Sequence, residues 1–358
     1  MSKNTEYYIL AAVVALLVLV LMVPVGYTVY NKWQVKKYNY YYIRYYDWEA
    51  IDIIFEDPAV QVYFKNWGVL ERKAKTQSPG SLDCIGQVMQ WYKKWIRNFT
   101  STEKTLLEYS VKYLRQKGGV HRDWKFVKIH GNLEFGYPFT LGEFIFIPHT
   151  WLEMATSASK NLDYTQFSTA VNRAIHTPHN SSKNDYVLKS FVYILAHERI
   201  HVHQRENPSI YKELHKTLGF VEVPQNKIVL DDWTNTVRVT NPDSYRNCTW
   251  LIQLRDQWYL PMLILDPRDK SDKPKGILIH VVQTKEGNWS PVSYLGNIVY
   301  YPISEFDEYV QRHYLSHGMY DPNEIVAYVA ADLLTNHKIA DTPGNKLIMD
   351  FVKKHKII

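Results

Sequence analysis

Residues 191–205 read FVYILAHERIHVHQR, and this stretch carries the strongest structural and chemical signal in the chain. The apolar residues before the polar motif predict a buried helix over about 186–205. His197 and His201 are four residues apart, so they would share one face of that helix. Two imidazoles at this spacing can hold one zinc ion, with Glu198 beside them.

Glu198 is the expected general base of such a site. From the position next to His197 it can reach a water on the metal and take its proton as the water attacks a peptide carbonyl. Zinc there would lower the pKa of the water and polarise the carbonyl. The competing interpretation is a helix that carries the H-E-x-x-H pattern by chance.

A third metal ligand has to come from elsewhere in the chain, because a catalytic zinc site uses three protein ligands and one open position. A third histidine six residues after the second is excluded, since Asn207 stands there. We expect Glu324 to be this ligand. Asp321 as N-cap and Pro322 at the first position predict the start of its helix. The same spacing also permits Glu324 to be only a capping residue.

Other candidates for the site are less specific. Asp332 lies two helical turns beyond Glu324 and is either an alternative ligand or a carboxylate that supports a ligand. A Tyr or His could stabilise the oxyanion of the transition state, and the candidates are His313, His317 and Tyr245. Residues of these types are more often structural than catalytic, so each of the three also has a structural interpretation.

The two motifs together suggest a family. His197-Glu198-x-x-His201 followed by Asn323-Glu324 resembles the gluzincins, the thermolysin-like zinc metallopeptidases whose third ligand is the Glu of an Asn-Glu pair on a second helix. The wider context, residues 195–205 with 321–328, is similar to membrane-anchored metallopeptidases of large DNA viruses. The resemblance covers roughly residues 125–340, and the two zinc motifs carry most of it.

The resemblance implies an α+β, zincin-like fold in which the edge strand of a small sheet lies along the substrate. Phe144–Ile147 is the candidate for that strand. The chain departs from thermolysin at Tyr328, where the family has an aspartate that orients a zinc-binding histidine. The partner that would orient His197 or His201 is therefore open.

An uncharged apolar run, Ile9–Val25, precedes the rest of the chain. It is long enough to cross a bilayer, and tyrosines flank it at both ends, so the sequence predicts a transmembrane helix in contact with the lipid bilayer. A cleaved signal peptide is the alternative, but its apolar core would be shorter. The expected division is an anchor (1–30), a Tyr-rich collar with a helical N-terminal region (31–123) and a zincin-like domain (124–358).

Two sequence signals disagree on the side of the membrane on which the catalytic domain would lie. Basic residues after the span place the catalytic domain on the cytoplasmic side of a single-pass membrane protein, such as a virion membrane protein. Four N-x-[ST] sequons, at Asn98, Asn180, Asn247 and Asn288, favour the opposite side, although a few arise by chance.

The composition of the chain limits the classes of binding partner that can be expected. The net charge is +6 over 358 residues without a long basic block, which gives no support for nucleic-acid binding. Cys84 and Cys248 are the only cysteines, so a disulfide scaffold is excluded, and whether they pair is open.

Two functions follow from these motifs. The first is a membrane-anchored zinc endopeptidase that acts on a protein or peptide. The second is a catalytically inactive relative, for example a structural tether between a virion membrane and its capsid. Intact histidines and Glu198 favour the enzyme.

Overall fold

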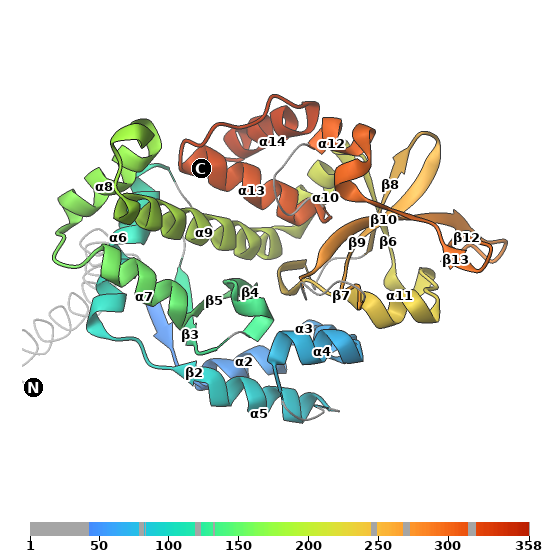
Figure 1. Cartoon of the computed structure of the whole chain (residues 1–358), viewed down its shortest axis with the longest axis horizontal. Helices are drawn as coiled ribbons and strands as arrows, with labels where there is room; N and C mark the ends of the chain where they lie inside the picture. The colour runs from blue at the N-terminus through green and yellow to red at the C-terminus, as the bar shows by residue number, and fades with distance from the viewer. Residues whose placement is uncertain are drawn as a thin grey trace, which may run out of the picture. The chain divides into compact units, whose positions relative to one another are not determined.

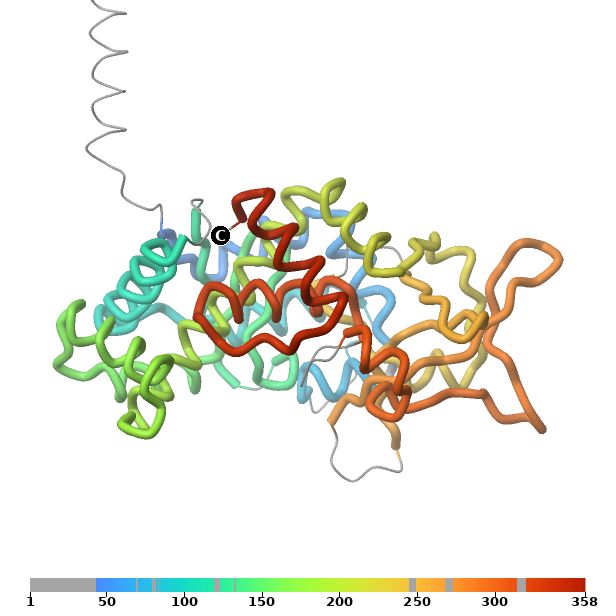
Figure 2. The backbone as a smooth tube through the Cα atoms, turned by 90° about the horizontal axis from the view of Figure 1, so that it is seen from above, coloured from blue at the N-terminus to red at the C-terminus, as the bar shows by residue number. Residues whose placement is uncertain are grey.

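The computed structural model describes residues 43–357, except for 79–81, 83, 119–122, 132, 245–248, 268–272 and 314–319. Residues Ile43–Ile358 form one unit by their contacts, and Met1–Tyr42 form a separate one that lies outside the description. Figures 1 and 2 show α6, α7 and α8 at one end of the described unit and the hairpins of a larger sheet at the other, with α9 and α13 between them.

The first sheet has five strands: β1 (Ile43–Tyr46), β2 (Ile96–Arg97), β3 (Trp124–Ile129), β4 (Phe139–Leu141) and β5 (Phe144–Pro148). Its order is β1-β3-β5-β4, with β2 paired to β3. The pairs β1–β3 and β3–β5 are parallel, and β4–β5 is antiparallel. The sequence placed a domain boundary between residues 123 and 124. The strands β1 and β2 lie before this boundary and pair with β3, which lies after it, so the sheet contains strands from both sides.

The outer strand on the β4 side differs from the expectation. The sequence suggested Phe144–Ile147 as the edge strand, but β5 is paired on both sides and β4 forms the edge in the described part of the chain. The reason is burial. All five residues of β5 are buried, and an unbroken apolar strand of this kind is typical of the inside of a sheet.

Short helices cover one face of the first sheet. They are α2 (Glu49–Glu56), α3 (Pro58–Lys65), α4 (Val69–Thr76) and α5 (Ile85–Trp95). The apolar faces of α2, α3 and α5 share one core with side chains of the sheet, such as Val127, Phe144 and Phe146.

In the described part of the chain, four further helices pack together on the other side. They are α6 (Ser101–Gln116), α7 (His149–Ala158), α8 (Tyr164–His176) and α9 (Lys183–Glu206). A fifth, α10 (Pro208–Thr217), follows α9 and contacts β6 (Phe220–Val223) of the second sheet. The start of α6 is a capping box: Thr100 accepts from the Glu103 amide, and Glu103 accepts from the Thr100 amide. In Figure 1, α9 runs between β4 and β5 on one side and α13 on the other.

The second sheet has seven antiparallel strands in the order β11-β10-β9-β8-β6, with β14 paired to β10 and β7 paired to β9. Their bounds are β6 (Phe220–Val223), β7 (Arg238–Val239), β8 (Thr249–Leu254), β9 (Gln257–Ile264), β10 (Lys275–Gln283), β11 (Trp289–Pro291) and β14 (Tyr300–Pro302). A separate hairpin joins β12 (Ser293–Tyr294) to β13 (Asn297–Ile298).

The remaining helices follow the strands of this sheet in the chain or lie between them. They are α11 (Asp232–Val237), α12 (Asp307–His313), α13 (Pro322–Leu334) and α14 (Pro343–Lys354). One core joins α9, α10, α13 and α14 to β6, β8, β9 and β10. The helix predicted to begin near Pro322 is confirmed as α13, which packs along α9.

The expectation of a membrane-spanning fold is corrected. Its predicted helix, Ile9–Val25, lies outside the described residues, and no helix within them combines the length and the apolar character needed to cross a bilayer. The longest, α9, has 24 residues but carries charged side chains at both ends and within the motif. The described fold is α+β without a transmembrane helix, and it lends no support to the expected single-pass membrane localisation.

Candidate metal centre

Helix α9 positions two of the expected ligands. Its N-terminus is a capping box, in which Ser182 accepts from the Asp185 amide and Asp185 accepts from the Ser182 amide. The second half of the helix is largely enclosed by other elements, so the polar residues from His197 to His201 are buried there, as is Gln204. His197 and His201 lie on one buried face of α9, where water no longer hydrates them. They therefore need polar partners within the protein.

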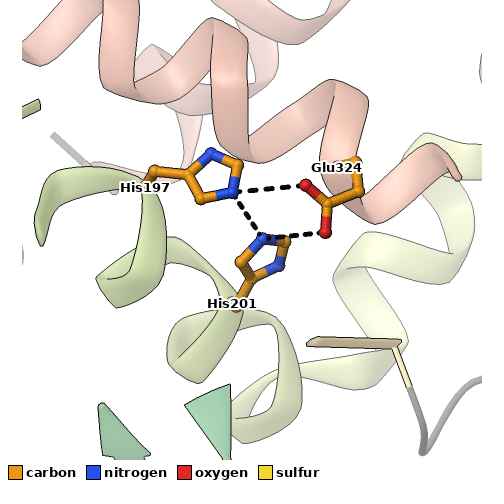
Figure 3. Close-up of side chains that lie close together, drawn as sticks. All are labelled: His197, His201 and Glu324. Atoms are coloured by element: carbon orange, nitrogen blue, oxygen red, sulfur yellow. Dashed lines mark hydrogen bonds and ion pairs between the residues drawn. The ribbon is translucent and has the colours of Figure 1, made fainter. Parts of the chain in front are cut away.

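Helix α13 supplies those partners. Asp321 caps it by accepting from the amide of Asn323, and Pro322 occupies the first position. The following turn is apolar and packs into the core, which places Glu324 against α9. The Glu324 carboxylate faces both histidines (Figure 3), and the capping role that the sequence also permitted is taken by Asp321.

The three side chains form a small triangle. The Nε2 atoms of His197 and His201 are 3.0 Å apart, and the Glu324 carboxylate oxygens lie 3.2 Å from the first and 3.4 Å from the second. Ligands of a tetrahedral zinc ion at its usual bond lengths are separated by about 3.3 Å. This buried group could hold a metal ion, and its donor set and spacing fit zinc.

The charges in the triangle support one another. Burial disfavours charge on all three groups, but the two histidines hold the pKa of Glu324 well below its usual range. Burial lowers the pKa of His197. Burial also opposes charge on His201, yet Glu324 and Asp243 outweigh it and raise the pKa of that imidazole. An ionised carboxylate facing two imidazoles is an arrangement that favours a cation.

Gln204 answers the question of what orients a histidine. Its Oε1 lies 2.8 Å from Nδ1 of His201, which places the ring proton on Nδ1 and leaves the Nε2 lone pair free for a metal. Its Nε2 donates to the carbonyl oxygen of Asn323 at 2.9 Å. One amide therefore orients a ligand on α9 and ties it to the residue before Glu324 on α13.

Tyr328 occupies the place where thermolysin-like proteins have an aspartate, and it contacts His197 by its ring. The two ring centroids are 4.3 Å apart. Burial, followed by the nearby carboxylates of Glu324 and Glu198, raises the pKa of Tyr328. In the described part of the chain, Nδ1 of His197 has no hydrogen-bond partner, so this side of the ring is held by packing, whereas Nε2 faces His201 and Glu324.

Glu198 lies beside the triangle and meets a second carboxyl group. Burial, and then the negative charges of Asp243 and Glu324, raise the pKa of Glu198 well above its usual range. The Oδ1 atom of Asp243 also accepts from the amide and the hydroxyl of Thr140 on β4, at 2.7 and 2.6 Å. The expected base is thus linked through Asp243 to the edge strand.

A short segment covers the centre. Residues 241–244 include the 3-10 turn Pro242–Ser244, and we refer to them as the 241–244 segment. Asn241 donates to Glu324 at 2.7 Å, Ser244 accepts from Asn323, and Arg205 donates to the Asp243 carbonyl at 2.7 Å. The exposed fractions of the metal-centre residues are at most 5%, namely His197 3%, Glu198 1%, His201 0% and Glu324 5%.

The other candidates lie apart from these contacts. His313 is buried in the core, where its ring faces Phe220 and Tyr309. Asp332 interacts with Tyr193 by a hydrogen bond and lies 3.9 Å from His337. His317, Tyr245 and Cys248 lie outside the described residues, so the structure gives no position for them. Cys84 is exposed with a free thiol.

Sequence reasoning did not identify Asn241, Asp243 or Gln204 as parts of the site. The stretch Asn241-Pro-Asp-Ser244 has the composition of an ordinary turn, and no spacing relates it to the motif on α9. Only Gln204 had a usable signal, since it lies three residues after His201 and hence on a neighbouring face of the helix.

Comparisons with known proteins do not extend this description. No protein-family model, curated protein or solved structure matches the chain.

Proposed function

We propose that the chain is a zinc-dependent peptidase of the gluzincin type, in which His197, His201 and Glu324 hold the metal and Glu198 is the general base. The triangle of donor atoms carries the proposal, because its edges of 3.0 to 3.4 Å suit a single tetrahedral ion and Glu198 lies directly beside it. Two imidazoles and one carboxylate form a known ligand set of catalytic zinc.

Each residue then has a chemical role. Bound zinc would supply Lewis acidity, which polarises the scissile carbonyl and makes water a better nucleophile. Glu198 accepts the proton of the attacking water and delivers it to the leaving amine. A cation beside Glu198 favours its ionised form, and so opposes the effect of burial on its pKa.

The substrate in this proposal is a polypeptide in extended form. An edge strand can bind such a chain by main-chain hydrogen bonds, and β4 is the edge nearest to the base. The amide of Thr140 on β4 is occupied by Asp243, so substrate binding there requires the 241–244 segment to move.

A second candidate function is supported by the burial of the centre. Structural metal sites are closed, whereas catalytic ones keep an open position. A chain that binds zinc only to hold α9 against α13, and hydrolyses nothing, would also explain side chains that are at most 5% exposed. The two functions differ in what Glu198 does.

The test compares the full chain with its Glu198→Gln variant, and uses elemental analysis for zinc and unfolded casein as substrate. We expect about one zinc per chain in both proteins, and a cleavage rate about 10² to 10⁴ lower in the variant because the general base is lost. Glu324→Ala should lose the zinc, and Glu213→Gln, an exposed carboxylate on α10, is the matched control.

Each alternative outcome has a definite meaning. Equal cleavage by the parent and Glu198→Gln would contradict the role of the base. A zinc-loaded parent that cleaves no casein, in a preparation that keeps its fold, would favour the structural metal site.

A further inference from the structure

Three ionisable side chains lie fully inside the protein on the side of the first sheet away from α9. Glu71 and Lys75 come from α4, and Glu134 comes from the turn Leu133–Gly136; their exposed fractions are 0, 1 and 4%. The ammonium nitrogen of Lys75 lies 3.0 Å from Glu71, 2.9 Å from Glu134 and 2.6 Å from the hydroxyl of Tyr63. We refer to Glu71, Lys75 and Glu134 as the buried ion cluster.

The buried ion cluster forms hydrogen bonds with both the backbone amide and the backbone carbonyl of Thr240. The carboxylate of Glu71 accepts from the amide of Thr240 at 2.7 Å and from its hydroxyl at 2.5 Å. The ammonium of Lys75 donates to the carbonyl oxygen of Thr240 at 2.6 Å. Hydrogen bonds to ionised groups are the stronger ones, so Thr240 is held at its nitrogen and at its oxygen.

This grip acts next to the metal centre. The Thr240 carbonyl belongs to the peptide bond that leads into Asn241, and the side-chain Nδ2 of Asn241 donates to the carboxylate of Glu324 at 2.7 Å. The opposite end of the 241–244 segment is held by Thr140, whose amide and hydroxyl bind Asp243. The segment is therefore fastened at both ends, and its Asn241 end reaches a metal ligand.

The cluster is a poor device for stability alone. A buried ion pair loses most of its Coulomb energy to desolvation, and apolar residues of the same volume often serve the fold equally well. Glu134 and Phe135 also hold left-handed backbone angles, with φ of 49° and 63°, which disfavour side-chain-bearing residues. Strain of this kind concentrates at functional sites.

From these contacts we infer that Glu71 and Lys75 are positioning residues for the metal centre: they hold the Thr240–Asn241 peptide so that Asn241 fixes the carboxylate of Glu324. Hydrogen bonds to ligating carboxylates orient the ligand, and their loss commonly weakens metal binding 10- to 100-fold. The inference rests on the proposed zinc site but does not depend on peptide hydrolysis.

The experiment is a double-mutant cycle on the full chain, with zinc affinity measured by competition against a chromophoric chelator. Asn241→Ala and Lys75→Met should each weaken zinc binding by about tenfold or more. Because Lys75 acts through Asn241, adding Lys75→Met to Asn241→Ala should change the affinity by less than about twofold. If Lys75 and Asn241 acted independently, the fold-losses of zinc affinity of the two single variants would instead multiply in the double variant.

Two controls keep the test clear of unfolding. The triple variant Glu71→Gln, Lys75→Met, Glu134→Gln leaves no unpaired buried charge, so it should fold while zinc binding stays weak. Lys128→Met, which removes the cation from the nearly buried pair with Glu103 at 2.7 Å, should leave zinc affinity unchanged.

The outcomes separate the two proposals. Undiminished zinc affinity in folded Lys75→Met or in the triple variant would overturn the positioning role alone, as would additive effects in the cycle. A parent chain that binds no zinc would overturn the proposed function. Weak binding in both cluster variants, with no additivity, supports the inference whether or not casein is cleaved.

Discussion

Among single residues, Gln204 has the clearest consequence for the centre. It accepts from Nδ1 of His201 at 2.8 Å and donates to the carbonyl of Asn323 at 2.9 Å. It thereby selects the tautomer of His201 whose Nε2 can bind a metal, and couples that ring to α13. Gln204→Leu removes both bonds with little change in volume, and we expect zinc affinity to fall about 10- to 100-fold.

The matched control for this change is Gln253→Leu, at an exposed position of β8. It should leave zinc affinity unchanged in the same competition titration. If Gln204→Leu kept the affinity of the parent within about twofold, the orientation of His201 would not depend on this amide.

Among the elements, the 241–244 segment joins the centre to its surroundings, and we expect it to control the exchange of a bound metal. It is bound to β4 through Thr140, to α9 through Arg205 and to α13 through Glu324. Asp243→Ala removes the two hydrogen bonds that Thr140 donates to this side chain, each worth about 1 kcal/mol. Opening of the segment should become more frequent, and a chelator should withdraw zinc at least about tenfold faster.

Stopped-flow absorbance of the chelator measures this rate, and Asp232→Ala at an exposed position of α11 is the control. An unchanged rate of zinc withdrawal in the Asp243 variant would mean that the metal leaves by a route that this segment does not cover.

In the whole molecule, two buried histidines link stability to pH. His215 faces Trp250 at 4.9 Å between ring centroids, and His313 faces Phe220 at 5.4 Å. Burial lowers the pKa of each to about 3. The unfolded chain, with pKa values near 6.5, therefore takes up protons before the folded one does, and stability falls as the pH drops below about 6.5.

The expected size follows from the same pKa values. At pH 5 each histidine should remove about 2 kcal/mol from the free energy of unfolding relative to pH 7, and the loss should continue toward pH 3. Urea unfolding of the metal-free chain measures this, so that zinc release does not contribute. His215→Phe should make the dependence on pH shallower by that amount; an identical slope would contradict the assignment.

Local features of the chain could be predicted from sequence because they depend on neighbours within one or two helical turns. The shared face of His197 and His201 follows from the period of the helix, and the start of α13 follows from Asp321 and Pro322. The capping box of α6 has the same origin. Glu324 could be proposed as a ligand from the sequence because a recognisable helix start marks its position.

The tertiary structure alone decided which distant groups complete the centre. Asn241 lies 83 residues before Glu324, and Asp243 lies 103 residues after Thr140. No periodicity connects such pairs, since they meet only when the first sheet, α9 and α13 have packed. The same holds for β4 as the edge strand, which depends on pairing order, and for His313, whose place in the core depends on Phe220. Local structure follows from the spacing of residues along the chain, whereas these distant contacts result from the burial of whole elements against one another.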